Sequence, residues 1–219
     1  VKLGNGTVPS LLKISAPEEH FSLDSDNLFD MVYKLVDESK EISNVPITYS
    51  FLKNRITSFV YNCKYRTDYN NSILLQILAF HSSMDLKIVI LTNKTNEKNW
   101  EYTKVLPHCW NDEKNVRFFA TNEQELNEVS SYLSGIYRAR LEARENNENT
   151  TLYYPYYLII TDDYMKVKNS QLVLDIVNNN VNAGFSLMAL SNSIRTLPNQ
   201  SNKFLEKKYP SSNNTLNEA

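Results

Sequence analysis

The sequence predicts an α/β fold in which a mostly parallel sheet lies between two layers of helices. Three observations predict it. Apolar segments of strand length alternate along the chain with segments of helical periodicity, an order typical of parallel sheets. Residues 156–161 are apolar at consecutive positions, as in a strand that is buried on both faces. With 219 residues, 42% of them hydrophobic, the chain is long enough to form a substantial core.

The first elements are expected as follows. Residues 1–20 read as an irregular lead-in with a short strand at 11–14. A helix capped by Asp24 or Ser25 follows and ends near Ser43, because side-chain oxygens at these positions can accept from the first turn. Its apolar face consists of Leu28, Met31, Val32 and Leu35. Strands are expected at 45–51 and 56–61, the second more buried than the first, and a polar loop at 62–71.

The second half of the chain continues the alternation. A buried helix is expected at 73–81, strands at 86–91 and 116–120, a long helix that ends near Asn146, strands at 156–161 and 185–190, and a helix at 172–177 between them. Thr121 and Gln124 fit a capping box for the long helix. We therefore divide the chain into the lead-in at 1–20, one α/β domain at 21–197 and a polar, loose tail at 198–219.

Charge and hydropathy exclude several function classes. The net charge of −2 lacks the basic excess typical of nucleic-acid binding. The longest apolar runs, such as residues 88–91, are too short to cross a bilayer, and no secretory signal opens the chain. Because the first residue is Val1, we expect a piece of a longer protein. Cys63 and Cys109 are expected as free thiols in a reducing compartment, since two cysteines make no disulfide framework.

The position of a phosphate-binding loop is the most informative part of the sequence. In an open α/β sheet that loop would follow the strand at 56–61. A P-loop needs glycines, whose backbone N–H groups wrap the phosphates, a lysine for the β- and γ-phosphates, and a Ser or Thr for Mg²⁺. No glycine lies between residues 7 and 134. The degenerate loop consists of Asn62, Cys63, Lys64, Tyr65, Arg66, Thr67 and Asp68.

A pair of acids stands where a Walker B pair would stand. Asp162 and Asp163 directly follow the apolar strand at 156–161. In a working ATPase the first acid helps to hold Mg²⁺ and the second orients water, but without a phosphate cradle upstream the pair has little to act on. We expect Asp162 to cap the following turn and Asp163 to face solvent. No catalytic residue, no nucleotide-binding residue and no metal site is expected in this chain.

Other candidate residues favour structural roles. His20, His81 and His108 lack the spacing of metal ligands. Tyrosines at 153, 154, 156 and 157 read equally well as a contact surface or as strand residues that pack on a helix. Arginines at 138, 140 and 144 share a helix with Glu142 and Glu145, which indicates a solvated, ion-paired face.

Several short segments carry a resemblance to a known family. They are residues 3–10 and 14–21, Val45-Pro46-Ile47, Leu78-Ala79-Phe80-His81, Asp85-Leu86-Lys87, Trp100, Leu106-Pro107-His108 and Ile159-Ile160-Thr161-Asp162. In this order they resemble the EssC family, the membrane-anchored FtsK/SpoIIIE-type ATPases of type VII secretion in Firmicutes. The resemblance covers nearly the whole chain and weakens after about residue 200. The matching segment lies between the family's transmembrane helices and its first recognised ATPase domain.

The resemblance implies a specific place in a larger machine. It implies a P-loop-NTPase-like module with a degenerate nucleotide site, on the cytoplasmic face of the cell membrane, attached through upstream helices. ATP and Mg²⁺ would act in other domains of the parent ATPase. The expected partners are other domains and copies of the same motor protein, and secreted helical substrates or other secretion components. No catalytic residue carries over, because no Walker A position matches.

Three readings of function follow. The first is a non-catalytic structural or regulatory module that contributes to assembly of the motor and to protein export. The second is a binding module for secreted substrates or accessory proteins, through the tyrosine-rich segment or an aromatic loop with Trp100 and Trp110. The third is an atypical nucleotide binder in which Lys64, Arg66 and Asp162 contact phosphate and metal. We rank them in this order.

Overall fold

The computed structural model describes residues 1–12, 14–16, 27–61, 66–146 and 153–207. The chain forms two compact units, Val1–Tyr49 and Ser50–Ala219, and each is considered by itself. No helix within the described residues is both long and apolar enough to span a bilayer. The division after Tyr49 differs from the expected boundary after residue 20, because the segment at 1–9 pairs with a strand that ends at Thr48.

The first unit is an antiparallel pair of strands with one helix. Strand β1 (Lys2–Pro9) pairs with β2 (Glu41–Thr48), and helix α1 (Asn27–Glu38) lies between them in sequence. The N-terminal amine of Val1 donates to the carbonyl oxygen of Tyr49 at 2.8 Å, which closes the open end of the pair. Among the described residues of this unit, Tyr49 is the only buried hydrophobic side chain. The unit therefore has little core of its own.

Several predictions for the first unit are wrong. Residues 11, 12 and 14 of the strand expected at 11–14 form no strand, and Leu11 and Leu12 are exposed; Lys13 lies outside the described residues. The lead-in instead contains β1, because backbone pairing with β2 outweighs the local apolar pattern. Helix α1 ends at Glu38, earlier than Ser43, since β2 begins at Glu41. The predicted caps Asp24 and Ser25 lie outside the described residues.

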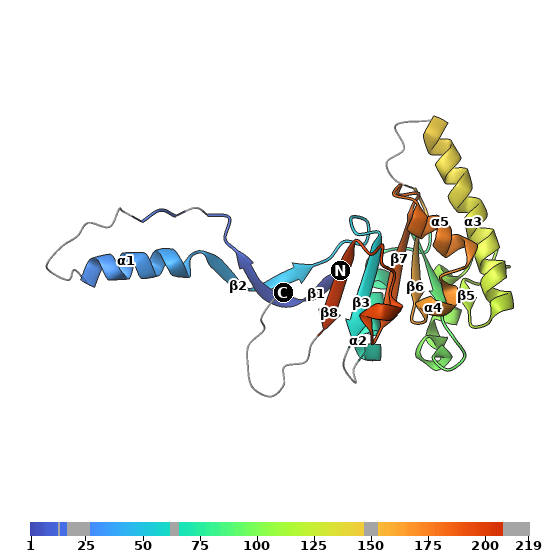
Figure 1. Ribbon diagram of the computed structural model, residues 1–219, viewed down its shortest axis with the longest axis horizontal. Coiled ribbons are helices and arrows are strands. Elements are labelled where there is room, and N and C mark those ends of the chain that lie inside the picture. The colour runs from blue at the N-terminus through green and yellow to red at the C-terminus, as the bar shows by residue number, and fades with distance from the viewer. Residues whose placement is uncertain (13, 17–26, 62–65, 147–152, 208–219) are drawn as a thin grey trace. The chain divides into compact units, whose positions relative to one another are not determined.

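The second unit contains a six-stranded parallel sheet, which confirms the predicted fold class (Figure 1). Its strand order is β5-β4-β6-β7-β3-β8. The strands are β3 (Ile56–Tyr61), β4 (Leu86–Leu91), β5 (Phe119–Ala120), β6 (Tyr156–Thr161), β7 (Phe185–Ser191) and β8 (Lys203–Lys207). Every residue of β4 and β6 is buried, as the continuous apolar runs predict.

Helices cover both faces of this sheet. Helices α3 (Glu123–Asn146), α4 (Tyr164–Val167) and α5 (Gln171–Asn178) contribute to a core cluster that includes Ile56 of β3, and Figure 1 shows α3 beside α5. Tyr61 lies five residues after Ile56 and so points to the opposite face. There its hydroxyl donates to Asn70 of helix α2 (Arg66–Phe80) at 2.5 Å. The sheet thus lies between α2 and the α3–α5 layer.

Several element boundaries in this unit differ from the predictions. Helix α2 begins at Arg66, inside the segment predicted as a loop. Strand β5 has two residues, fewer than the five expected at 116–120. Strand β8 lies in the segment predicted as a loose tail, because it completes the sheet beside β3; residues 208–219 lie outside the described part. The predicted cap of α3 is right for Thr121 and wrong for Gln124. Thr121 donates to the carboxylate of Glu125, and the N–H of Glu125 donates to the side chain of Asn122.

Arg140 of α3 bonds to the segments that precede β6 and β7. Its guanidinium donates to the carbonyl oxygens of Ala183, at 3.2 Å, and Pro155, at 2.9 Å. It also lies 5.2 Å from the ring centre of Tyr157 and 5.5 Å from that of Phe185, and these two rings stack on each other. The predicted solvated arginine face is therefore wrong at this position, because the helix turns Arg140 toward the sheet.

We expect Arg140→Met to lower the free energy of unfolding by about 2–4 kcal/mol, because two hydrogen bonds from a charged donor are lost while the apolar stem remains. Urea unfolding of the whole chain, followed by tryptophan fluorescence, reports on this unit because both tryptophans lie in it. Arg138→Met is the matched control. The half-exposed side chain of Arg138 lies 3.5 Å from Asp175, so Arg138→Met should lower the free energy of unfolding by less than about 1 kcal/mol. Equal losses in the two variants would contradict the assignment.

Candidate functional site

The carboxyl ends of β3, β4 and β6 meet at one edge of the sheet, where a nucleotide would bind in a fold of this class. Parallel pairing brings the residues that follow these strands together. Thr92 and Asn93 follow β4, and Asp162 and Asp163 follow β6. Strands β4 and β6 are neighbours in register, with Leu91 opposite Thr161. The Walker-B-like acids therefore lie next to the end of β4.

Both carboxylate oxygens of Asp162 are engaged by side chains of the protein. One accepts from the hydroxyl of Thr92 at 2.7 Å, and the other accepts from the indole N–H of Trp100 at 2.9 Å. Thr92 is 5% exposed and Trp100 is 3% exposed, so water competes weakly for these bonds. The prediction that Asp162 caps the following turn is wrong. It instead joins the end of β6 to the end of β4 and to the loop beyond it.

Asp163 has a second, weaker set of partners. It accepts from the side-chain amide of Asn93 at 2.9 Å and lies 4.0 Å from the ammonium of Lys166. It occupies the N-cap position of α4 but makes no side-chain cap bond there. The prediction that it faces solvent is therefore wrong, because it is half-buried and bonded to the loop after β4. Together, Asp162 and Asp163 link the end of β6 to the end of β4 and to the loop that follows it.

The degenerate loop between β3 and α2 is described only in part. Asn62, Cys63, Lys64 and Tyr65 lie outside the described residues. The remaining three, Arg66, Thr67 and Asp68, begin α2, which corrects their assignment to a loop. Asn70 in the same turn is buried and accepts from Tyr61. That bond fixes the start of α2 against the end of β3.

A hollow between Asp162 and the start of α2 is small. It is lined by Thr67, Asn70, Asn71, Asn99, Trp100 and Asp162. Its volume is about 10 Å³, room for about one water molecule. The indole of Trp100 and the amide side chains of Asn70, Asn71 and Asn99 border this hollow. The described residues therefore provide hydrogen-bonded packing at this edge.

The aromatic segments predicted as contact surfaces are mostly packed inside the unit. The indole of Trp110 donates to the carbonyl oxygen of Lys104 at 2.9 Å. Among the four tyrosines, Tyr153 donates to the carbonyl oxygen of Arg140, and Tyr156 and Tyr157 are buried. Tyr154 alone of the four is largely exposed, at 65%. Of the two readings of this segment, packing therefore fits better.

Histidine and cysteine show no reactive arrangement in the described part. No group of three or more His, Cys, Asp or Glu side chains there could hold a metal ion. A ring nitrogen of His108 lies 2.9 Å from the carbonyl oxygen of His81, and His20 lies outside the described residues. Cys109 is completely buried. Burial raises the pKa of its thiol to about 12, although a hydrogen bond with Thr103 acts in the opposite direction.

Thr92, Asn93 and the role of Trp100 are missing from the sequence-based site. A signal for the first two was present, because two polar residues directly follow an apolar strand, just as Asp162 and Asp163 do. Polar ends of neighbouring parallel strands meet at one edge, so the pairing could have been inferred once the strands were known to be adjacent. Trp100 gave no such signal, since it reaches Asp162 from a loop of 3-10 turns spanning residues 97–109.

Comparison with known proteins confirms the predicted resemblance. The chain is 22% identical over 201 residues to the type VII secretion system protein EssC of Staphylococcus aureus, a match that covers 90% of this chain and 14% of that protein. It is 24% identical over 178 residues to the ESX secretion system protein YukB of Bacillus subtilis, covering 81% of this chain and 11% of that one. The chain thus spans about a seventh of the length of the EssC relatives. No protein-family model matches the sequence.

Solved structures show the same fold. The cytoplasmic domain of EssC superposes with a TM-score of 0.58 at 12% identity, over 74% of this chain and 34% of that one. ATPases 2 and 3 of EssC from Geobacillus thermodenitrificans give a TM-score of 0.55 at 11% identity, over 75% and 32% of the two chains. The fold is therefore that of the ATPase domains of type VII secretion proteins, a P-loop-NTPase-like fold.

We expect Asp162→Asn to lower the free energy of unfolding by about 1–3 kcal/mol, because the amide keeps one acceptor and places an N–H₂ group against a buried donor. Urea unfolding followed by the emission of Trp100 measures it, in a Trp110→Phe background. Asp163→Asn is the matched control and should lose less than about 1 kcal/mol, since its partner Asn93 can still donate to an amide oxygen. If Asp162→Asn left the free energy of unfolding unchanged, the two bonds of Asp162 would not stabilise this edge of the sheet.

Cys109 should be inert toward thiol reagents in the folded chain. In a Cys63→Ser variant at pH 8, its reaction with a chromogenic disulfide should be at least about a hundredfold slower than after unfolding in urea, because the thiolate is the reactive form and burial keeps the thiol protonated. Absorbance of the released thiol measures the rate. A native rate close to the unfolded one would mean that Cys109 is accessible and ionised.

Proposed function

We propose that this chain is a non-hydrolysing, ATPase-like module of a type VII secretion motor, which contributes to assembly of the motor and to protein export. The similarity to EssC over 90% of the chain supports the placement in such a system. The lack of any glycine between residues 7 and 134 supports the loss of hydrolysis, because backbone N–H groups cannot wrap a phosphate closely without glycine.

The observation that carries the proposal is the engagement of Asp162. A magnesium ligand needs a carboxylate oxygen that can turn to the ion or to its water shell. Here both oxygens accept from buried donors, and the adjoining hollow holds about one water molecule. Mg-ATP at this position would have to compete with these bonds and with the indole of Trp100 for the space beside Asp162. The same bonds hold β4 and β6 in one arrangement, which suits a part that keeps neighbouring domains in register.

The proposed setting follows from the relatives. The module would lie on the cytoplasmic face of the cell membrane as one domain of a membrane-anchored protein. Its partners would be other domains and other copies of that protein, and no cofactor would bind to this domain. ATP and Mg²⁺ would act in ATPase domains elsewhere in the same motor.

The two other readings have less support. In an atypical nucleotide site, Asp162 would need a free oxygen, while Lys64 and the side chain of Arg66 lie outside the described residues. For substrate binding, one related structure of Thermomonospora curvata EccC holds a signal sequence peptide; it superposes with a TM-score of 0.50 at 12% identity, over 68% of this chain and 27% of that one. The aromatic residues suggested for such a role here are mostly packed inside the unit.

Neither Mg-ATP nor Mg-ADP should stabilise the chain. A ligand that binds only the folded state would raise the free energy of unfolding by about 2.7 kcal/mol at a hundredfold excess over its dissociation constant. Thermal unfolding with millimolar nucleotide measures this. Trp100→Ala is an informative second variant, because it enlarges the hollow without supplying a glycine cradle. We expect no nucleotide stabilisation in either protein, and a clear shift in the unmodified chain would overturn the proposal.

A further inference from the structure

A second crevice opens at the same edge of the sheet, between β4 and β5. The connection that follows β4 packs on the α2 side, where Tyr102 donates to Asn71 at 2.7 Å and His108 meets the carbonyl oxygen of His81. The connection that follows β5 is α3, on the opposite side. Neighbouring parallel strands whose connections leave to opposite faces create a crevice at their carboxyl ends, and ligands of α/β proteins bind in such crevices.

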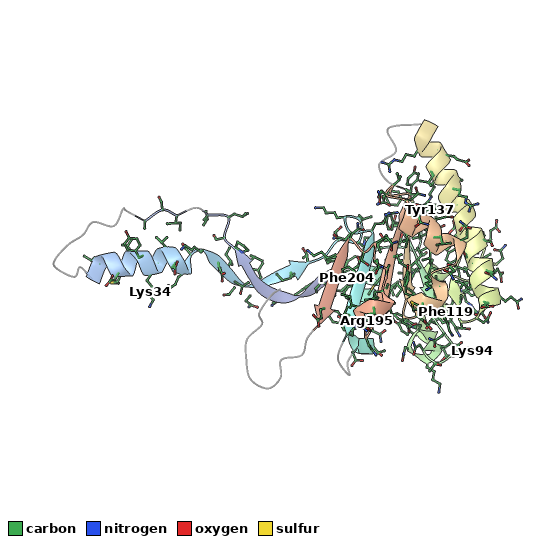
Figure 2. All side chains as sticks on the ribbon, in the orientation of Figure 1. Lys34, Lys94, Phe119, Tyr137, Arg195 and Phe204 are labelled. Carbon is green, nitrogen blue, oxygen red and sulfur yellow. The ribbon has the colours of Figure 1, made fainter. Side chains whose placement is uncertain are left out.

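This crevice is a cavity of about 490 Å³, within the range of ligand sites and far larger than the hollow beside Asp162. It is bounded by the ends of β4 and β5, the start of α3 and the short helix α4. Figure 2 shows Lys94, on the loop after β4, at the same end of the unit as Phe119 of β5. We name this cavity the β4–β5 crevice.

The floor of the β4–β5 crevice is apolar. Leu91, Ala120 and Val167 line it and are at most 2% exposed, and the half-buried Leu126 of α3 forms one wall. Thr92 and Thr121 also line it, but their hydroxyls already donate to Asp162 and Glu125. The floor therefore favours a hydrocarbon or aromatic group over a hydrated one.

The charged residues that line the crevice are two lysines, Lys94 and Lys166, and one glutamate, Glu123. Lys94 is exposed and makes no ion pair with any residue of the described segments. Lys166 lies 4.0 Å from Asp163 and keeps most of its side chain in solvent. The amino end of the 24-residue helix α3 adds first-turn N–H groups and the positive end of its dipole. Glu123 is the one carboxylate in the lining, and the carboxylates of Glu125 and Asp163 lie just outside it, bonded to Thr121 and Asn93.

From this arrangement we propose that the β4–β5 crevice binds an organic anion with an apolar body. The apolar part lies on Leu91, Ala120 and Val167, and the anionic group lies between Lys94, Lys166 and the start of α3. The ligand is either a free carboxylate on a hydrocarbon group or an acidic side chain beside an apolar one in a protein segment. This site is separate from the nucleotide position, so it stands or falls independently of the proposed function.

Hexanoate and hexanamide form the first test, because they share an apolar body and differ in charge. Backbone amide resonances of the ¹⁵N-labelled chain are followed during titration with each. We expect saturable shifts at Lys94, Ala120, Glu123 and Val167, with hexanoate binding about fivefold or more tightly than hexanamide, the preference that one partly exposed ion pair and a helix end provide. Equal affinities, or shifts centred on the exposed Phe80 and Val105 instead, would overturn the proposal.

Charge and volume variants locate the site. Combined Lys94→Met and Lys166→Met should abolish the preference for hexanoate, and Leu126→Trp should weaken both ligands by narrowing the cavity. Lys98→Met and Lys168→Met, which remove two lysines outside the lining, form the control and should leave both affinities unchanged. If the control pair alters the preference as strongly as the lining pair, the effect is a general surface charge and the site is refuted.

A titration with short peptides distinguishes a protein segment from a free small molecule as the ligand. Acetyl-Leu-Glu-Leu-amide is compared with acetyl-Leu-Gln-Leu-amide and with hexanoate in the same titration. Binding of the acidic peptide about tenfold more tightly than hexanoate assigns the crevice to a protein segment, because additional contacts add affinity. Tighter binding of hexanoate assigns it to a free small molecule. Binding of none of these compounds overturns the proposal.

Discussion

The carboxylate of Asp162 determines the arrangement of the carboxyl edge of the sheet. Its two oxygens accept from Thr92 and Trp100, both buried, and so tie the end of β6 to the end of β4 and to the loop that follows. Loss of the carboxylate would leave both buried donors without an acceptor, which is costly. These two bonds fix the position of Trp100 beside the small hollow, while Tyr102 and His108 hold the rest of residues 97–109 against α2 and its end.

The carboxyl edge of the sheet contains two hollows of very different size. Both arise from the same topological rule, since each lies where connections leave the sheet on different faces. At the end of β3, side chains of α2 and Trp100 fill the space to about 10 Å³. Between β4 and β5 about 490 Å³ stays open. The larger hollow is the one in which we propose that an organic anion binds.

The two units of the chain differ in how they use apolar residues. In the described residues of Ser50–Ala219, apolar side chains of five strands and four helices are buried on the two faces of the sheet. In Val1–Tyr49, the stripe of Leu28, Met31 and Leu35 on α1 is exposed by 61–70%. The periodicity of this stripe correctly predicts a helix, but one pair of strands offers too little area to cover it.

The sequence by itself determined the fold class, β3, β4 and β6 at their observed bounds, and the lack of a glycine cradle, because these depend on local apolar periodicity and on residue type. It did not determine β1 or β8, which form only because a partner strand offers backbone hydrogen bonds. Nor did it determine the partners of Asp162 or the inward position of Arg140. Those bonds join residues 70, 62, 43 and 15 positions apart along the chain, so only the packing of strands and helices could bring them together.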